Sequence, residues 1–283
     1  DKVVMKMGDW VITNRNPEVR ILQCNLPLEE FHELQKKYSK ETLVRIKREI
    51  YERTLAVGED INPEVIKEVF SKYGFKCQLE NISTKTINVY RIVEEAARKF
   101  NLPVPKIVIS NMIIPNAAAS GPSPGRGVIL ITTGLLAQLN EDEILGVIGH
   151  EFSHLKNRDT LALFSLTSLE YLLRVYFFWP IVMMFGYLYI LLALSIVYFV
   201  AKFFEARADL ESAIKIGKPR VLAEALRKIG YRKLQFEKIP AYRIQGWIGW
   251  DPHPPLYFRV ARLEKLKSPE EVKHLFLRSI KDN

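Results

Sequence analysis

A long apolar stretch constrains the fold of this 283-residue chain more than any other feature. Residues 175–201 contain no charged side chain, and residues 161–173 contain only Glu170. One helical crossing of a bilayer core needs about 20 apolar residues, so residues 161–204 have room for two crossings joined by a tight turn. We therefore expect a transmembrane helical hairpin over residues 161–204.

The flanks of this stretch predict its orientation. Basic residues stand at both ends of the expected hairpin and are absent from its turn; they are Lys156, Arg158, Lys202 and Arg207. The sequence does not decide whether the turn falls at Trp179-Pro180 or at residues 184–186. Under the positive-inside rule, both ends of the hairpin face the cytoplasm. The chain is thus expected in the cell membrane as a multi-pass protein whose remaining mass is cytoplasmic.

Two alternatives to a full hairpin stay open. The apolar helices could instead be buried in a large soluble core or in an oligomer interface, and oligomers are compatible with the sequence. Glu170 and Arg174 oppose full insertion, because a charge at the bilayer centre costs about 2.5–3.5 kcal/mol on insertion scales. Spaced four apart, they can pair with each other. Alternatively, the first helix lies partly outside the lipid.

The charge balance narrows the choice of partners. A formal net charge of +9 is typical of a chain that approaches an anionic membrane surface or a nucleic acid. The sequence contains no zinc-knuckle spacing, Gly-Arg repeat or aromatic RNA-binding box. We therefore expect a lipid bilayer as partner, and no nucleic acid.

Directly before the apolar stretch stands the sequence His150-Glu151-Phe152-Ser153-His154. On a helix, two histidines four residues apart lie on one face, so both imidazoles can bind a single Zn²⁺ ion. Glu151 is then placed to act as a general base on a water molecule at that site. This pattern is typical of the zinc-binding helix of a metallopeptidase, although a five-residue match alone is a moderate signal.

The helix that carries this motif has a clear start. Asn140 and Glu143 form a capping-box-like pair, with acidic residues in the first turn. Gly146 and Gly149 each cost roughly 0.5–1 kcal/mol against Ala inside a helix. Their presence suggests that another backbone packs closely against this helix.

A third metal ligand is expected after the apolar stretch. Catalytic zinc usually has three protein ligands and one open position. Glu205 and Asp209 follow the hairpin and share one helical face. A hairpin that begins at the histidines returns Glu205 close to them, so Glu205 is the natural third ligand. Asp209 can then hydrogen-bond the outer nitrogen of a ligating histidine. Outside this context, Glu205 would be read as a surface carboxylate.

These motifs resemble the membrane-integrated zinc metallopeptidases, a family that comprises the HtpX-type heat-shock proteases and the CAAX prenyl endopeptidases. The similarity covers roughly residues 100–265. It rests on motifs in the family's order: Pro115-Asn116-Ala117, Thr132-Thr133-Gly134-Leu135-Leu136, Asp142-Glu143, residues 150–154 with Asn157-Arg158-Asp159, Glu205 to Asp209, and His253-Pro254-Pro255 with Arg259.

The resemblance implies both a fold and a set of roles. The fold would be α+β and mostly helical, with a gluzincin-like peptidase domain that contains the hairpin. His150, His154 and Glu205 would bind zinc, and Glu151 would be the catalytic base. His253 and Arg259 would approach the site as transition-state stabilisers. Residues Gly127, Val128, Ile129 and Leu130 would form an edge strand to which substrate adds. Read alone, His253 is a turn histidine between prolines, and Arg259 belongs to an amphipathic helix.

The chain divides into an accessory α+β region over residues 1–85 and a peptidase domain over residues 86–283. Strand-like residues 9–13 and 19–24 are expected to pair as a hairpin, and residues 28–55 have helical spacing. Family members usually carry two membrane helices before the peptidase domain, and residues 1–100 contain none. The chain is therefore expected to be truncated or to belong to a variant subgroup.

Three functions are compatible with these features. The leading one is a membrane zinc endopeptidase for quality control under stress, which hydrolyses misfolded or unassembled membrane proteins. A second is a processing protease for a defined, lipid-modified substrate. A third is a non-catalytic zinc-containing membrane binding protein, which the presence of Glu151 opposes because a dead enzyme could lose this residue and keep its metal.

Overall fold

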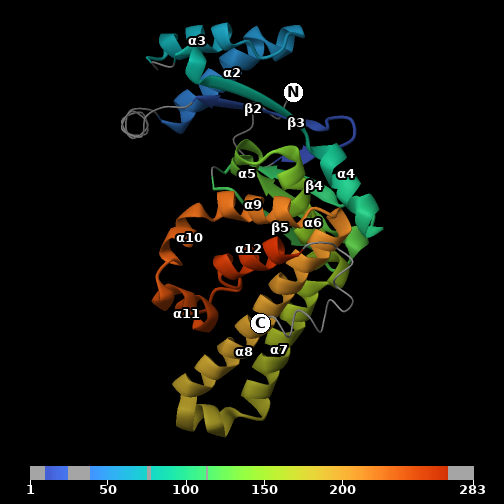
Figure 1. Cartoon of the computed structure of the whole chain (residues 1–283), viewed down its shortest axis with the longest axis vertical. Helices are drawn as coiled ribbons and strands as arrows, with labels where there is room; N and C mark the ends of the chain where they lie inside the picture. Colours follow the sequence, from blue (N-terminus) through green and yellow to red (C-terminus); the bar gives the residue numbers. More distant parts are fainter. Residues whose placement is uncertain (1–9, 25–38, 75–77, 113, 267–283) are drawn as a thin grey trace.

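The computed structural model describes residues 10–24, 39–74, 78–112 and 114–266 (Figure 1). The fold is α+β and mostly helical, as expected. Its elements are β1 (Trp10–Ile12), β2 (Glu18–Cys24), α2 (Lys40–Arg53), α3 (Pro63–Lys72), β3 (Ile82–Asn88), α4 (Val89–Phe100), β4 (Lys106–Ser110), β5 (Ala117–Ser120), β6 (Val128–Thr132), α5 (Thr133–Gln138), α6 (Glu141–Asn157), α7 (Asp159–Tyr176), α8 (Trp179–Ile216), α9 (Pro219–Ile229), α10 (Tyr231–Phe236), α11 (Pro240–Ile248) and α12 (Leu256–Lys265), with short 3-10 turns at Leu55–Val57, Leu79–Asn81 and Pro124–Arg126.

A four-stranded sheet in the order β1-β4-β6-β5 supports the central domain. β6 runs parallel to β4 and antiparallel to β5. The strand predicted from residues 127–132 is therefore present, but it is not an edge. β6 is paired on both sides, and its alternate residues Ile129 and Ile131 are fully buried in the core. Among the described residues, the edge next to the site belongs to β5.

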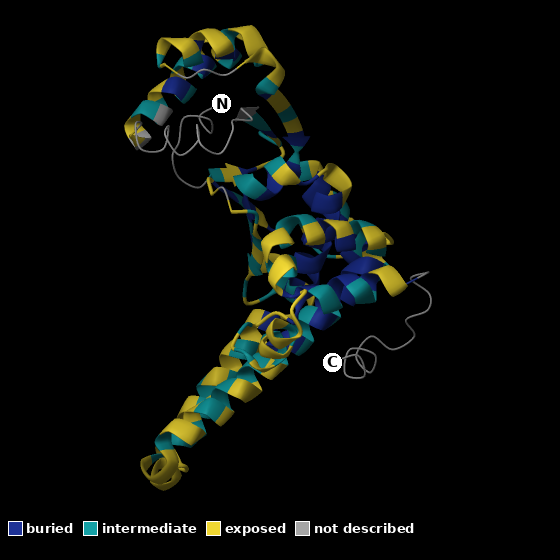
Figure 2. Ribbon diagram, turned by 60° about the vertical axis from the view of Figure 1, so that its left-hand side comes forward, coloured by how far each residue is buried: buried dark blue, intermediate teal, exposed yellow. Residues whose placement is uncertain are grey.

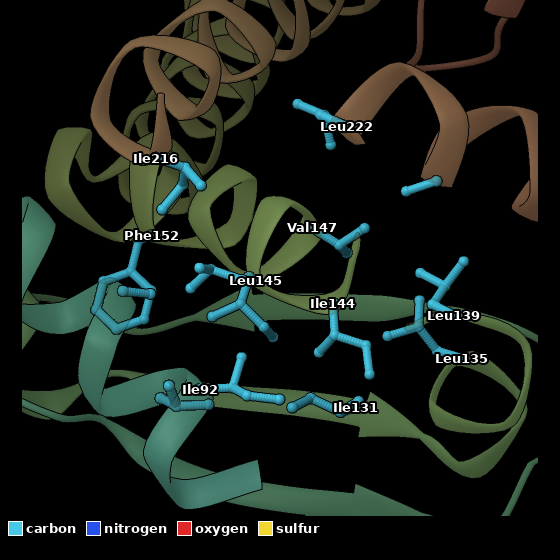
Figure 3. Packing of buried hydrophobic residues seen from close by; sticks show 14 of the residues in the cluster. Ile92, Ile131, Leu135, Leu139, Ile144, Leu145, Val147, Phe152, Ile216 and Leu222 are labelled. Atoms are coloured by element: carbon cyan, nitrogen blue, oxygen red, sulfur yellow. The ribbon is translucent and has the colours of Figure 1, made fainter. Parts of the chain in front are cut away.

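α4 packs against α6, and α6 packs against β5 of this sheet. α4 buries one stripe at helical spacing, made of Val89, Ile92, Val93, Ala96, Ala97 and Phe100. α6 is enclosed on several sides: in Figure 3, Ile92 of α4 and Ile131 of β6 lie on one side of α6, and Ile216 of α8 lies on the other. The motif helix is thus the centre of the core.

α6 begins with the predicted capping box. Asn140 Oδ1 accepts the backbone N–H of Glu143, and the Glu143 carboxylate accepts the backbone N–H of Asn140, both at 2.9 Å. The helix ends at Arg158, whose left-handed φ of 57° breaks the helical run before α7 begins. These two ends fix the register of residues 150–154 within the core.

α6 and α8 cross closely at Gly149. A Cβ atom on Gly149 would lie 2.7 Å from Ile216 Cγ1 and from Ser212 Oγ, whereas one on Gly146 would make ordinary contacts with Leu222 of α9. Close packing was expected at both glycines, and it is tight only at Gly149. A buried polar network also joins the two helices, because Ser153 Oγ donates to Glu211 at 2.6 Å.

The N-terminal residues form a second, smaller unit (Figure 1, top). β2 pairs with β3, and α2 and α3 lie over them around a separate cluster that includes Ile50, Ile66 and Val69. Residue 85, where we placed the domain boundary, falls inside β3. The first half of the predicted 28–55 helical region, residues 28–38, lies outside the described residues.

The predicted pairing between residues 9–13 and 19–24 is wrong. A turn does close between Thr13 and Asn16, but β1 pairs with β4 and β2 pairs with β3. β1 pairs with the distant strand β4 because this pairing buries Ile12 in the main core, where Ile12 is 3% exposed.

α7 and α8 lie side by side and project from the domain (Figures 1 and 2). The chain turns after Tyr176, next to the first of the two predicted positions, and α8 is kinked at Phe185, within the second. Among the described residues, α8 is the one helix long and apolar enough to cross a membrane, and its most apolar window has no buried residue. The predicted pairing of Glu170 with Arg174 is present at 3.1 Å. The hairpin exists as a helix pair, and its insertion into lipid stays a prediction.

Candidate metal centre

The two motif histidines and Glu205 meet where α6 passes α8. His150 Nε2 lies 3.1 Å from His154 Nε2 and 3.3 Å from Glu205 Oε2, and His154 Nε2 lies 3.2 Å from Glu205 Oε1. These three side chains form the one group in the described residues whose ligand atoms could converge on a metal ion. The spacing of the two helices therefore brings together the residues that the sequence singled out.

The distances suit zinc. Zinc binds imidazole nitrogen at about 2.0–2.1 Å with tetrahedral geometry, which separates two ligand atoms by about 3.4 Å. The three observed separations are close to this value. The site also leaves an acceptor unsatisfied, because Glu205 Oε2 is buried and receives no hydrogen bond from any described residue. The donor set thus fits a zinc ion on its own geometry.

A carboxylate lies behind each imidazole. His150 Nδ1 lies 2.9 Å from Asp209 Oδ1, and His154 Nδ1 lies 2.8 Å from Asp159 Oδ2. A proton on each Nδ1 leaves the Nε2 lone pairs of both rings directed toward one point. Two lone pairs that face each other repel unless a cation lies between them, so this arrangement favours a metal ion.

Each of these carboxylates is in turn held by an arginine. Arg259 of α12 donates from Nε and Nη2 to the two oxygens of Asp209, at 2.7 and 2.8 Å, and this pair is almost fully buried. Arg207 of α8 donates to Asp159. The two histidines therefore stand at the ends of two matching carboxylate–arginine chains.

The pKa values reflect the concentrated negative charge. Burial lowers the pKa of His154, but hydrogen bonds with Asp159 and Glu205 outweigh burial and raise this pKa to about 10. Burial likewise opposes a charged His150, and Glu205 and Asp209 raise its pKa despite this. Although burial alone would raise it, the pKa of Glu205 is held well below its usual range by the nearby histidines and Arg259. A potential that retains protons on imidazoles also attracts a metal cation.

Two adjacent hollows meet at this cluster. The first, of about 230 Å³, extends among apolar side chains of α6, α9 and α12. The second, of about 300 Å³, lies between β5, the start of α7 and the part of α8 around Glu205. His150, Glu151, Glu205 and His253 line both hollows, as does Ala117 of β5. The two hollows together form a cleft that passes through the candidate metal centre. Glu151, which is 7% exposed, lies where the two hollows meet.

The edge strand along this cleft differs from the predicted one. Residues Gly127, Val128, Ile129 and Leu130 were expected to meet substrate, but β6 is covered by β5. Ala117, Ala118 and Ala119 of β5 line the second hollow instead. The alanines gave no strand signal beside the strongly apolar residues 128–132, so sequence reasoning passed over them.

His253 and Arg259 both reach the site. His253 Nε2 lies 3.6 Å from Glu205 Oε2, while its Nδ1 and backbone N lie 3.0 and 2.9 Å from Asp251 Oδ1. Lys233 donates to the other oxygen of Asp251 at 2.6 Å. Arg259 Nη1 lies 3.6 Å from Glu205.

Three residues around the candidate metal centre were not predicted from the sequence: Asp159, Arg207 and Asp251. Asp159 and Arg207 stood inside quoted motifs, but neither was assigned a role at the metal site. Asp251 could have been noticed from its position two residues before His253, since a carboxylate that precedes a histidine by two residues can accept from its backbone and ring.

Comparison with known proteins agrees with this geometry. Residues 83–267 match the model of peptidase family M48. A protease HtpX homolog of Thermodesulfovibrio yellowstonii is 31% identical over 235 residues, which cover 71% of this chain and 81% of that protein. The homolog of Moorella thermoacetica is 35% identical over 161 residues, which cover 50% and 54%.

A third relative matches over a shorter stretch. The protease HtpX homolog of Pyrococcus abyssi is 52% identical over 73 residues, which span a quarter of that protein. The family match begins in β3 and continues just past α12, and so includes the strands and helices that build the candidate metal centre. The chain therefore belongs to peptidase family M48.

Proposed function

We propose that this chain is a membrane-anchored zinc endopeptidase that hydrolyses misfolded or unassembled membrane proteins from the cytoplasmic side. The observation that carries the proposal is the convergence of His150, His154 and Glu205 at 3.1–3.3 Å, with Glu151 beside them in a cleft. Family membership supports a protease in general. Zinc dependence and the choice of substrate are the parts that we propose.

Zinc would be held by Nε2 of both histidines and by the Glu205 carboxylate. When bound, zinc supplies Lewis acidity, which makes a water molecule a competent nucleophile at neutral pH. Glu151 accepts the proton of the attacking water and returns it to the leaving amine. Its position on the same helix, one residue after His150, keeps the base close to the site in a fixed orientation.

His253 and Arg259 have different parts in this proposal. The His253 side chain is 48% exposed and lines both hollows, so its ring can donate to the oxyanion that develops on the substrate carbonyl. Arg259 uses Nε and Nη2 to hold Asp209. This geometry favours a positioning role for Arg259, through Asp209 and His150, over direct stabilisation of the transition state.

We propose β5 as the strand to which the substrate backbone adds. It lies along the second hollow, and its outer edge is unpaired among the described residues. An extended peptide can form main-chain hydrogen bonds with such an edge, which would pass its carbonyl groups across the candidate metal centre.

Membrane substrates are favoured by the position of the hairpin. α7 begins five residues after His154, and Glu205 lies on α8 immediately after its apolar stretch. An anchor attached at both of these points would keep the cleft close to the lipid surface. In the described residues, the projecting pair α7 and α8 does not enclose the site as the many helices of a prenyl endopeptidase would, which favours quality control over processing of a lipid-modified terminus.

The test uses Glu151→Gln in the full chain. We expect the purified variant to retain stoichiometric zinc and to cleave neither casein nor a destabilised membrane protein, while the parent cleaves both and loses activity with a chelator. Metal loss in the variant would overturn the assignment of Glu151 as base. Zinc-loaded parent protein that cleaves neither substrate would favour a non-catalytic binding protein.

A further inference from the structure

α11 exposes an apolar surface outside the proposed hairpin. None of its residues is buried. Ile244 is 60% exposed and Ile248 is 74% exposed, one helical turn apart on the same side. Tyr242 within the helix, Ile239 just before it and Trp250 just after it are also exposed. We call these five residues the outer face of α11.

The inner side of α11 carries the charge. Arg243 Nε donates to the backbone oxygen of Glu237 at 2.6 Å, and its guanidinium lies 4.7 Å from the ring centre of Tyr257. Trp247, one turn further, packs edge-on against Phe258 of α12. A helix on a water-facing surface turns its charges outward and its apolar residues inward. α11 turns Arg243 inward and exposes Ile244 and Ile248 together with the polar Gln245. Its outer face is therefore suited to the boundary between lipid and water.

α11 ends beside the base of the projecting helices. Lys202 Nζ donates to the backbone oxygen of Gly249 at 2.7 Å, and Lys202 is the first charged residue after the uncharged run 175–201. In Figure 1, α11 lies to the side of α7 and α8, level with the part of α8 nearest the central domain. The outer face of α11 therefore lies near the depth at which α8 would leave the hydrocarbon.

We propose that the outer face of α11 inserts into the interfacial layer of the lipid bilayer, as a third membrane contact beside α7 and α8. This inference rests on the proposed membrane anchoring of the hairpin. The occupant is identified by composition: residues 238–250 contain no acidic residue, Lys238 is exposed, and the outer face itself includes the aromatic residues Tyr242 and Trp250. Apolar and aromatic side chains with basic neighbours are typical of helices that lie in an anionic membrane surface.

This contact would set the height of the active-site cleft. Trp250 is followed within three residues by Pro252 and His253, which line the cleft. With α11 anchored in the interface, the entrance next to His253 lies at the lipid surface. A substrate segment that leaves the bilayer could then enter without crossing open water.

Site-directed spin labels test this contact. Cys24 and Cys77, the two cysteines of the chain, are replaced by Ser, and single labels are placed at Ile248, at Leu192 in the middle of α8, and at Val57 in the N-terminal unit. Each native side chain is more than half exposed, so the labels do not disturb packing. The full chain is reconstituted in vesicles of phosphatidylcholine and phosphatidylglycerol, and label contact with oxygen and with a water-soluble nickel complex is measured.

We expect the label at Leu192 to be protected from nickel and exposed to oxygen, the label at Ile248 to be intermediate with several-fold protection from nickel, and the label at Val57 to remain accessible to nickel. If Leu192 is protected and Ile248 is as accessible as Val57, the α11 contact is wrong and the membrane hairpin stands. If Leu192 is itself accessible to nickel, the membrane anchor fails, and the α11 inference fails with it.

Discussion

The Nδ1 atom of His154 lies 2.8 Å from Oδ2 of Asp159, across the left-handed residue at which α6 gives way to α7. The first residue of α7 thus supplies the carboxylate that orients the second histidine of α6. Arg207 of α8 holds this carboxylate from the other side. The same construction recurs at His150 with Asp209 and Arg259, so both imidazoles face Glu205 in a fixed orientation.

Replacement of Asp159 by Asn should weaken zinc binding by about 10–100-fold, the usual cost of losing such an outer partner. The amide keeps the size of the side chain but loses the charge that favours a proton on His154 Nδ1. Zinc affinity is measured by competition with a chromogenic chelator. Asp142→Asn is the matched control, because Asp142 is an exposed acidic residue of α6 that pairs with Lys218 away from the site. Equal zinc affinity in the two variants would contradict the proposed role of Asp159.

Removal of the Arg259 side-chain charge should destabilise the fold strongly. Arg259→Met leaves Asp209 buried without its partner, and breaking a buried pair costs about 3–5 kcal/mol. Arg227→Met removes a half-exposed arginine that pairs with Glu224 and Glu264, and should cost under about 1 kcal/mol. Denaturant unfolding in detergent compares the two. A similar loss in both variants would mean that the Arg259 pair contributes no more than a surface contact.

Gly149→Ala should separate α6 from α8. The added Cβ would lie 2.7 Å from Ile216 and Ser212, so a neighbour must move, and Glu205 on α8 would move with it away from the histidines. We expect reduced zinc occupancy together with a lower unfolding temperature. An added Cβ at Gly146 has room, so Gly146→Ala should leave the free energy of unfolding unchanged or raise it by up to about 0.5–1 kcal/mol through helix propensity. If both variants retain full zinc and stability, close packing at Gly149 does not position the site.

The metal-free protein should lose stability as pH rises. Hydrogen bonds with Asp159 and Glu205 raise the pKa of His154 from 6.5 to about 10 despite its burial. A pKa that is higher in the folded chain contributes stability fully below pH 6.5 and loses it as pH rises toward about 10. The unfolding temperature of chelator-treated protein should fall across this window, and fall less steeply in His154→Gln. Parallel curves for parent and variant would contradict this linkage.

Local patterns predicted the motif helix well. The spacing of Asn140 and Glu143 predicted the capping box, because that interaction spans only three residues. The position of Glu205 beside the histidines followed from a hairpin that must return to its start. Asp209 was likewise placed behind a histidine by its spacing of four from Glu205.

Long-range pairing was harder to predict. The strand at residues 128–132 was recognisable from its β-branched residues, but whether it lies at an edge depends on partners far along the chain. β5 consists of small residues without a strand pattern, so nothing in the sequence signalled that it covers β6. Asp159 was missed for a similar reason, because its contact with His154 depends on the left-handed backbone at Arg158.

X-ray anomalous scattering at the zinc edge, from crystals of Glu151→Gln purified without added metal, tests the central claim most directly. We predict a single zinc peak within about 2.0–2.2 Å of His150 Nε2, His154 Nε2 and a Glu205 oxygen. A peak that lacks Glu205 as a ligand, or a zinc ion bound elsewhere in the chain, would contradict the proposed metal centre.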